Sequence, residues 1–193
     1  EMFERVTKAA EDCGFEYMLI PVGHQCWDAW MTAALMIGRT KKIKMLVVAC
    51  NTASSVSLPT LKRHFHIPII GVIEPGAKSA IETSFTDNIG VIGTLGTVRS
   101  NSYKKALKKI KRKVTVIQDP CPLFVHLAED GWNNNKIAQL ISDEYLKIFK
   151  GKNIDTLILG CTHYPLLRRV IQKSVGTKVQ LIDSGRETAK EVN

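Results

Sequence analysis

The sequence predicts an α/β fold built mainly from parallel strands. Short apolar runs alternate with helical segments along the chain, which is the pattern of strands joined by helical crossovers. The run at 43–49 is almost continuously apolar, as expected for a strand that is covered on both faces. A similar run at 154–159 recurs later, and each run is followed by a cysteine and small polar residues. The repeated pattern indicates paired halves that face a shared site.

The expected elements follow one another at the spacing of this fold class. We expect strands at 15–22, 43–49, 69–73, 89–92, 114–118, 154–159 and 179–182. We expect helices at 1–13, 26–37, 54–65, 98–111, 133–149 and 165–173, with a short helix that ends at Asp130. In the helix at 133–149, the residues expected on the buried side are Ile137, Leu140, Ile141 and Ile148.

Glycine and proline mark the breaks between these elements. Glu74-Pro75-Gly76 is expected to end the strand at 69–73 and to mark a domain boundary. Residues 93–97, Gly-Thr-Leu-Gly-Thr, are expected to form a loop. The glycine spacing here departs from Gly-x-Gly-x-x-Gly, so a carboxylate-binding loop is a better interpretation than a dinucleotide site.

Size and composition are those of an ordinary globular protein. The chain has 193 residues, of which 45% are hydrophobic and 23% charged, enough for one or two domains. No apolar run approaches the roughly 18 residues needed to cross a bilayer, and the first residues lack a signal-peptide pattern. We therefore expect a cytoplasmic protein without membrane contact. The five cysteines include no Cys-x-x-Cys pair, which argues against a disulfide framework or a zinc finger.

Much of the net charge of +9 lies in one helical segment, 104–113. Its lysines fall three to four residues apart, opposite an apolar face of Tyr103, Ala106, Leu107 and Ile110. This spacing is typical of the solvated face of a helix, and no nucleic-acid motif accompanies it. We expect no nucleic-acid partner. No metal is expected either, since the histidines at 24, 64 and 66 lack a convincing set of further ligands.

Cys50 and Cys161 are the candidate reactive residues. Each follows a predicted strand and precedes a helical segment, and ligands of parallel α/β folds bind at the carboxyl ends of strands. A helix N-terminus stabilises a thiolate. Two opposed thiols could invert a stereocentre, one removing a proton from carbon and the other returning one. Acyl transfer through one cysteine with His163 as base, and buried structural cysteines, remain alternatives.

Six segments of the sequence closely resemble the bacterial glutamate racemases, in family order and over about three quarters of the chain. These segments are 47–54, 69–77, 90–94, 121–125, 159–167 and 181–185. The resemblance implies two similar layered α/β domains with mainly parallel sheets and the site between them. It assigns 1–73 plus 183–193 to the first domain and 74–182 to the second.

The resemblance also implies a function and a set of site residues. It implies cofactor-independent interconversion of L- and D-glutamate, which supplies D-glutamate for peptidoglycan, by a homodimer. Cys50 and Cys161 would be the catalytic acid/bases, one for each enantiomer, with His163 assisting Cys161. The implied substrate-binding residues are Asn51, Thr52, Thr94, Thr97, Glu129, Thr162 and His163.

The sequence departs from the family pattern near its start. Family members open with an Asp-Ser-Gly-x-Gly-Gly loop whose aspartate lies beside the first cysteine, and residues 1–40 contain no such loop. We therefore expect weak or no racemase activity from the 193-residue polypeptide. The alternatives are an aspartate racemase, or a non-catalytic or regulatory relative that binds an acidic amino acid or a partner.

Overall fold

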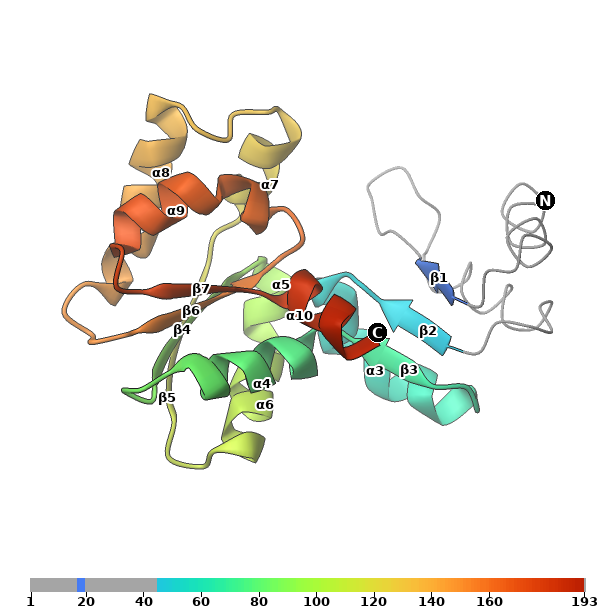
Figure 1. The fold of residues 1–193 in the computed structure, drawn as a ribbon. Coiled ribbons are helices and arrows are strands. Elements are labelled where there is room, and N and C mark those ends of the chain that lie inside the picture. Colours follow the sequence, from blue (N-terminus) through green and yellow to red (C-terminus); the bar gives the residue numbers. More distant parts are fainter. Residues whose placement is uncertain (1–16, 20–44, 193) are drawn as a thin grey trace.

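The structure is a computed structural model that describes residues 17–19 and 45–192 (Figure 1). The helices predicted at 1–13 and 26–37 lie outside the described residues. The predicted strand at 15–22 is confirmed over Tyr17–Leu19. No helix within the described ranges is both long and apolar enough to span a membrane.

The described strands form two parallel sheets. The first contains β1 (Tyr17–Leu19), β2 (Met45–Val48) and β3 (Ile69–Gly71) in that order. The second contains β4 (Asn88–Gly93), β5 (Thr115–Pro120), β6 (Thr156–Gly160) and β7 (Gln180–Asp183) in the order β5-β4-β6-β7. The predicted α/β class with parallel sheets is confirmed. The division into domains at 73/74 and 182/183 stays a prediction.

Helices connect the strands in the alternation that the sequence predicts. They are α3 (Asn51–His64), α4 (Ile73–Thr83), α5 (Leu95–Arg99), α6 (Ser102–Ile110), α7 (Leu123–Glu129), α8 (Lys136–Leu146), α9 (Arg168–Val175) and α10 (Ser184–Val192). Two short 3-10 segments, η1 (Lys147–Phe149) and η2 (Tyr164–Leu167), precede β6 and α9 respectively.

The second sheet is covered on both faces, which is why its two central strands, β4 and β6, are nearly all apolar. Helices α7, α8 and α9 lie on one face and α4 and α6 on the other (Figure 1). Each face of the sheet and its helices enclose a hydrophobic core. In β6, Leu157 and Leu159 pack into the core beneath α7, α8 and α9, and Ile158 packs into the core beneath α4 and α6. All three side chains are fully buried, each contributing roughly 1.5–3 kcal/mol to stability.

The strand expected at 69–73 ends earlier, at Gly71, and helix α4 already runs through Glu74-Pro75-Gly76. The domain boundary expected there stays a prediction. All three residues lie in the first turn of the helix. A proline is tolerated there because the first turn has no intrahelical partner for its N–H group. A Cβ at Gly76 would lie 3.1 Å from Cβ of Ser184, so a larger residue here would need a small shift of α10.

The expected loop at 93–97 is also wrong in part, because a short helix begins within it. Thr94 caps α5, its Oγ1 accepting a hydrogen bond from the amide of Thr97 at 3.2 Å. The long helix expected at 98–111 is divided instead between α5 and α6. Asn101 lies at the junction with a φ of 56°, a left-handed conformation that asparagine tolerates better than most residues.

Helix α8 buries a different face from the one expected. Ile137, Leu140 and Ile148 are exposed, and only Ile141 is partly buried. The buried residues are Ala138, Ser142 and Leu146, with Phe149 in the following turn. Polar contacts to α9 account for the rotation, since the hydroxyl of Ser174 donates to that of Ser142 at 2.8 Å.

Helix α3 begins at Asn51 rather than Ser54 and contains a proline. Pro59 has no N–H group to donate to the carbonyl of Ser55, four residues earlier. The hydroxyl of Ser102 donates to this carbonyl instead, at 2.9 Å. Because Pro59 leaves the carbonyl of Ser55 without a partner in α3, this carbonyl can bond α6, which packs against the second sheet.

Gly160 at the end of β6 offers a test of this packing. A Cβ at Gly160 would lie 2.6 Å from the carbonyl oxygen of Ile92, which belongs to the rigid neighbouring strand. We expect Gly160→Ala to lower the free energy of unfolding by about 1–3 kcal/mol, measured by urea denaturation.

The matched control is Gly185→Ala in the exposed first turn of α10, where a Cβ meets only ordinary contacts. We expect this variant to be as stable as the parent or slightly more so. Equal stability of Gly160→Ala and the parent would contradict the close approach of β4 and β6.

Candidate active site

Polar residues follow the carboxyl ends of strands from both sheets. Cys50 comes two residues after β2, and Cys161 directly follows β6. Thr94 follows β4. The order β5-β4-β6-β7 places the topological switch point of the second sheet between β4 and β6, where ligands of such folds bind. Thr94 and Cys161 therefore flank this point.

Cys50 caps helix α3 and is half-buried. Its Sγ accepts a hydrogen bond from the amide of Ala53 at 3.5 Å. The unpaired amides and the dipole at a helix N-terminus favour negative charge placed there. No acidic residue lies in the first turn of α3 to oppose that effect.

Cys161 has a more buried environment and a histidine beside it. Its side chain is 6% exposed, and its Sγ lies 3.7 Å from Nδ1 of His163. Burial raises the pKa of Cys161, and hydrogen bonding from the amide of His163 partly offsets this. A negative charge on Cys50 raises the pKa of Cys161 further. The two thiols are therefore close enough to influence each other electrostatically.

His163 links Cys161 to a carboxylate. Its Nε2 lies 3.4 Å from Oε1 of Glu129, at the end of α7. A carboxylate on one ring nitrogen orients the imidazole and sets which nitrogen carries the proton, leaving the other free to exchange a proton with the thiol. Thr162 completes this group, with its Oγ1 3.5 Å from Nδ1 of His163.

Three threonine hydroxyls meet where the sheets come together. Oγ1 of Thr52 lies 2.7 Å from that of Thr94 and 3.2 Å from that of Thr97, and the last two are 3.1 Å apart. Each hydroxyl can donate once and accept twice. The cluster can therefore redirect its hydrogens toward a carboxylate oxygen of a ligand.

Asn51 is almost fully buried, with 2% of its surface exposed. Its Oδ1 accepts hydrogen bonds from the hydroxyls of Tyr103 at 2.6 Å and Ser184 at 3.2 Å. Burial strongly raises the pKa of Tyr103, which keeps the phenol protonated and able to donate. The Nδ2 of Asn51 is buried without a hydrogen-bond partner among the described residues. Such a donor costs about 1–3 kcal/mol unless a ligand satisfies it.

The structure brings the predicted site residues together in two groups. Hydrogen bonds join Thr52 to Thr94 and Thr97 next to Cys50 and Asn51. Close contacts join the remaining residues, Glu129, Cys161, Thr162 and His163. The described residues contain no group of three or more histidine, cysteine or acidic side chains arranged to hold a metal ion.

Tyr103 and Ser184 belong to this region but are not among the predicted site residues. Tyr103 lies on the apolar face predicted for its helix, where a hydroxyl must find a partner when buried. Ser184 belongs to a triplet that is part of the family resemblance, 183–185. The phenol hydroxyl on an otherwise apolar helix face indicates that Tyr103 needs a buried hydrogen-bond partner. The sequence does not indicate that this partner is Asn51.

The fold and the site define a parallel α/β protein with two cysteines presented at strand ends. The family model for Asp/Glu/Hydantoin racemase matches residues 19–192. The chain belongs to this family.

Curated relatives at about 50% identity are glutamate racemases. The glutamate racemase of Geobacter metallireducens is 51% identical over 152 residues, which are 79% of this chain and 56% of the relative. That of a Carnobacterium species is 51% identical over 153 residues, covering 79% and 57% respectively. The chain thus spans little more than half the length of these relatives.

Solved structures show the same fold. Glutamate racemase isoform RacE1 from Bacillus anthracis superposes with a TM-score of 0.80 at 34% identity, covering 98% of this chain and 76% of that one. Glutamate racemase from Francisella tularensis, solved with D-glutamate, gives a TM-score of 0.78 at 30% identity and coverages of 98% and 74%.

The different environments of the cysteines predict different rates of alkylation by iodoacetamide. We expect Cys50 to react faster than Cys161 at neutral pH, because Cys161 is buried and its pKa is raised. The fully buried Cys121, whose pKa is also raised by burial, should react most slowly. Peptide mass mapping measures each rate.

The pH dependence provides a second readout of the same experiment. Because a raised pKa means less thiolate at neutral pH, the rate at Cys161 should keep increasing above pH about 9.5, roughly one unit above the ordinary thiol pKa, where the rate of an ordinary thiol approaches its plateau. Faster labelling of Cys161 than of Cys50 at neutral pH would contradict the burial described here.

Proposed function

We propose that this protein interconverts L- and D-glutamate without a cofactor, using Cys50 and Cys161 as paired acid/base groups. The observation that carries the proposal is that Cys50 and Cys161 follow strands of different sheets and lie close enough for a charge on Cys50 to raise the pKa of Cys161. The glutamate racemase relatives support the choice of reaction and substrate.

The proposed reaction is a proton exchange at one carbon. One thiolate takes the Cα proton and becomes a thiol, leaving a carbanion, and the opposite thiol gives its proton to the other face of that carbon. The carbanion needs preorganised donors, because a Cα–H is a very weak acid. Each cysteine would act as base toward one enantiomer. His163 would receive the proton of Cys161 or return it, and Glu129 would hold the His163 ring in place.

The residues around the thiols would bind the charged groups of the substrate. Asn51 would supply its Nδ2, which has no hydrogen-bond partner within residues 17–19 and 45–192, and Thr52, Thr94 and Thr97 would supply hydroxyls. Thr162 and His163, which lie beside Cys161, would also bind the charged groups of the substrate. We further propose the two-domain division at 73/74 and 182/183, with this site between the domains.

The proposal extends to the setting of the reaction. We propose that the D-glutamate supplies peptidoglycan synthesis and thereby supports cell shape, in the cytoplasm. The structure of the Francisella tularensis glutamate racemase with D-glutamate, and the names of the relatives, support glutamate as the substrate. We also propose that the protein acts as a homodimer.

Deuterium exchange at the Cα of each glutamate enantiomer in heavy water tests the proposed function. We expect exchange of both enantiomers with the parent, and a loss of at least about 100-fold for one or both enantiomers in Cys50→Ala and in Cys161→Ala. Exchange detects proton removal even when net racemisation is slow.

The matched control is Cys121→Ala, which removes a buried thiol that lies outside the site. This variant should keep the exchange rate of the parent once it is corrected for the folded fraction. Exchange that persists at the parental rate for both enantiomers in Cys50→Ala would refute the two-thiol mechanism. Aspartate exchange faster than glutamate exchange would reassign the substrate.

A further inference from the structure

A buried polar cluster joins three elements next to the segments that carry the two thiols. It consists of Asn51 at the start of α3, Tyr103 in α6 and Ser184 at the start of α10. All three residues are at most 2% exposed. Polar side chains are seldom buried this deeply unless they are hydrogen-bonded to one another, so the cluster requires an explanation.

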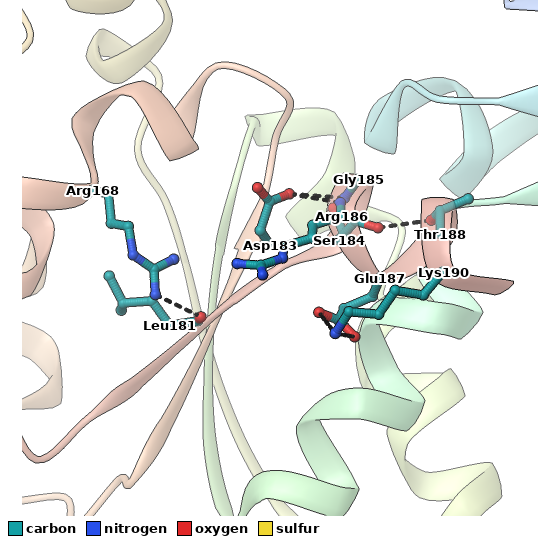
Figure 2. Close-up of polar contacts among 9 residues, drawn as sticks. All are labelled: Arg168, Leu181, Asp183, Ser184, Gly185, Arg186, Glu187, Thr188 and Lys190. Atoms are coloured by element: carbon teal, nitrogen blue, oxygen red, sulfur yellow. Dashed lines mark hydrogen bonds and ion pairs between the residues drawn. The ribbon is translucent and has the colours of Figure 1, made fainter. Parts of the chain in front are cut away.

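Ser184 is fixed by the start of its own helix (Figure 2). Oδ1 of Asp183 accepts hydrogen bonds from the amides of Gly185 and Arg186, at 3.0 and 3.2 Å, and so holds the first turn of α10. The hydroxyl of Thr188 donates to the carbonyl of Ser184 at 2.7 Å. These contacts fix the backbone from which the Ser184 hydroxyl reaches Asn51.

Tyr103 lies against the neighbours of both cysteines. Its hydroxyl bonds Asn51, which directly follows Cys50. Its ring edge lies 3.0 Å from where a Cβ on Gly160 would be, and Gly160 directly precedes Cys161. One rigid side chain thus spans the distance between the two thiol-bearing segments.

The cluster determines which way the amide of Asn51 faces. Two hydroxyls occupy its Oδ1, so its Nδ2 must point away from them. That Nδ2 is the buried donor without a partner among the described residues. It lies one residue from a proposed catalytic thiol, and a carboxylate oxygen is the acceptor that best matches a buried amide donor.

We propose that Tyr103 and Ser184 are positioning residues, which hold the Asn51 amide so that its Nδ2 donates a hydrogen bond to a carboxylate of the bound acidic amino acid. The inference rests on the proposed function. It deepens that function by assigning the orientation of the substrate to a cluster that does not itself touch the substrate.

Tyr103→Phe tests the proposal, because it removes the hydroxyl and keeps the ring against Gly160. We expect glutamate binding, measured by calorimetry, to weaken by about tenfold, as for loss of one well-placed charged hydrogen bond. In turnover the same change should raise KM by about the same factor and alter kcat less. A purely structural role would lower the folded fraction and leave KM unchanged.

The matched control is Tyr164→Phe. Tyr164 is equally buried, and its hydroxyl donates to a backbone carbonyl, that of Cys121 at 2.8 Å, without contacting Asn51. We expect this control to lower stability but to leave glutamate affinity unchanged. If Tyr103→Phe does not fold, Ser184→Ala applies the same test to the second donor.

A double-mutant cycle shows whether Tyr103 acts through Asn51. In an Asn51→Ala background, Tyr103→Phe should weaken glutamate binding no further. Additive effects, equal effects of the Tyr103 and Tyr164 variants on affinity, or no glutamate binding by the parent would each overturn the proposal. Glutamate binding without Cα exchange would reject the proposed function alone and leave the role of Tyr103 standing.

Discussion

The first turn of α3 is the point at which the two sheets are joined, and the arrangement of the site depends on it. Side chains of Asn51 and Thr52 and the carbonyl of Ser55 each hydrogen-bond to residues that connect strands of the second sheet. The apolar core of the first sheet is separate from the two cores of the second. Polar contacts therefore hold the two sheets in position relative to each other. Cys50 caps the helix whose start makes these contacts.

This junction brings together two thiols in unlike environments. Cys50 is half-buried at a helix N-terminus, and Cys161 is buried beside His163. Because a negative charge on Cys50 raises the pKa of Cys161, that charge favours the thiol form of Cys161. A proton exchange across one carbon requires one thiolate and one thiol.

The alternating pattern was sufficient to predict the parallel sheets and the strand ends that carry Cys50 and Cys161. It was not sufficient where a tertiary contact decides the local structure. Pro75 signals a break, but it occupies a helical first turn where its missing N–H is harmless. The isoleucines of α8 signal one face, but hydrogen bonds around Ser142 favour another. The partner of Tyr103 lies 52 positions away in the sequence, and no local pattern indicates it.

The central claim is that Cys50 and Cys161 face one small site, and bridging of the two thiols tests it most directly. Dibromobimane, a short reagent that joins two nearby thiols, would be added to the native chain, and the joined peptides identified by mass spectrometry. We predict a Cys50–Cys161 pair whose formation is suppressed by saturating glutamate. Single modification at each cysteine without bridging, or bridging of Cys161 only to Cys121, would contradict the claim.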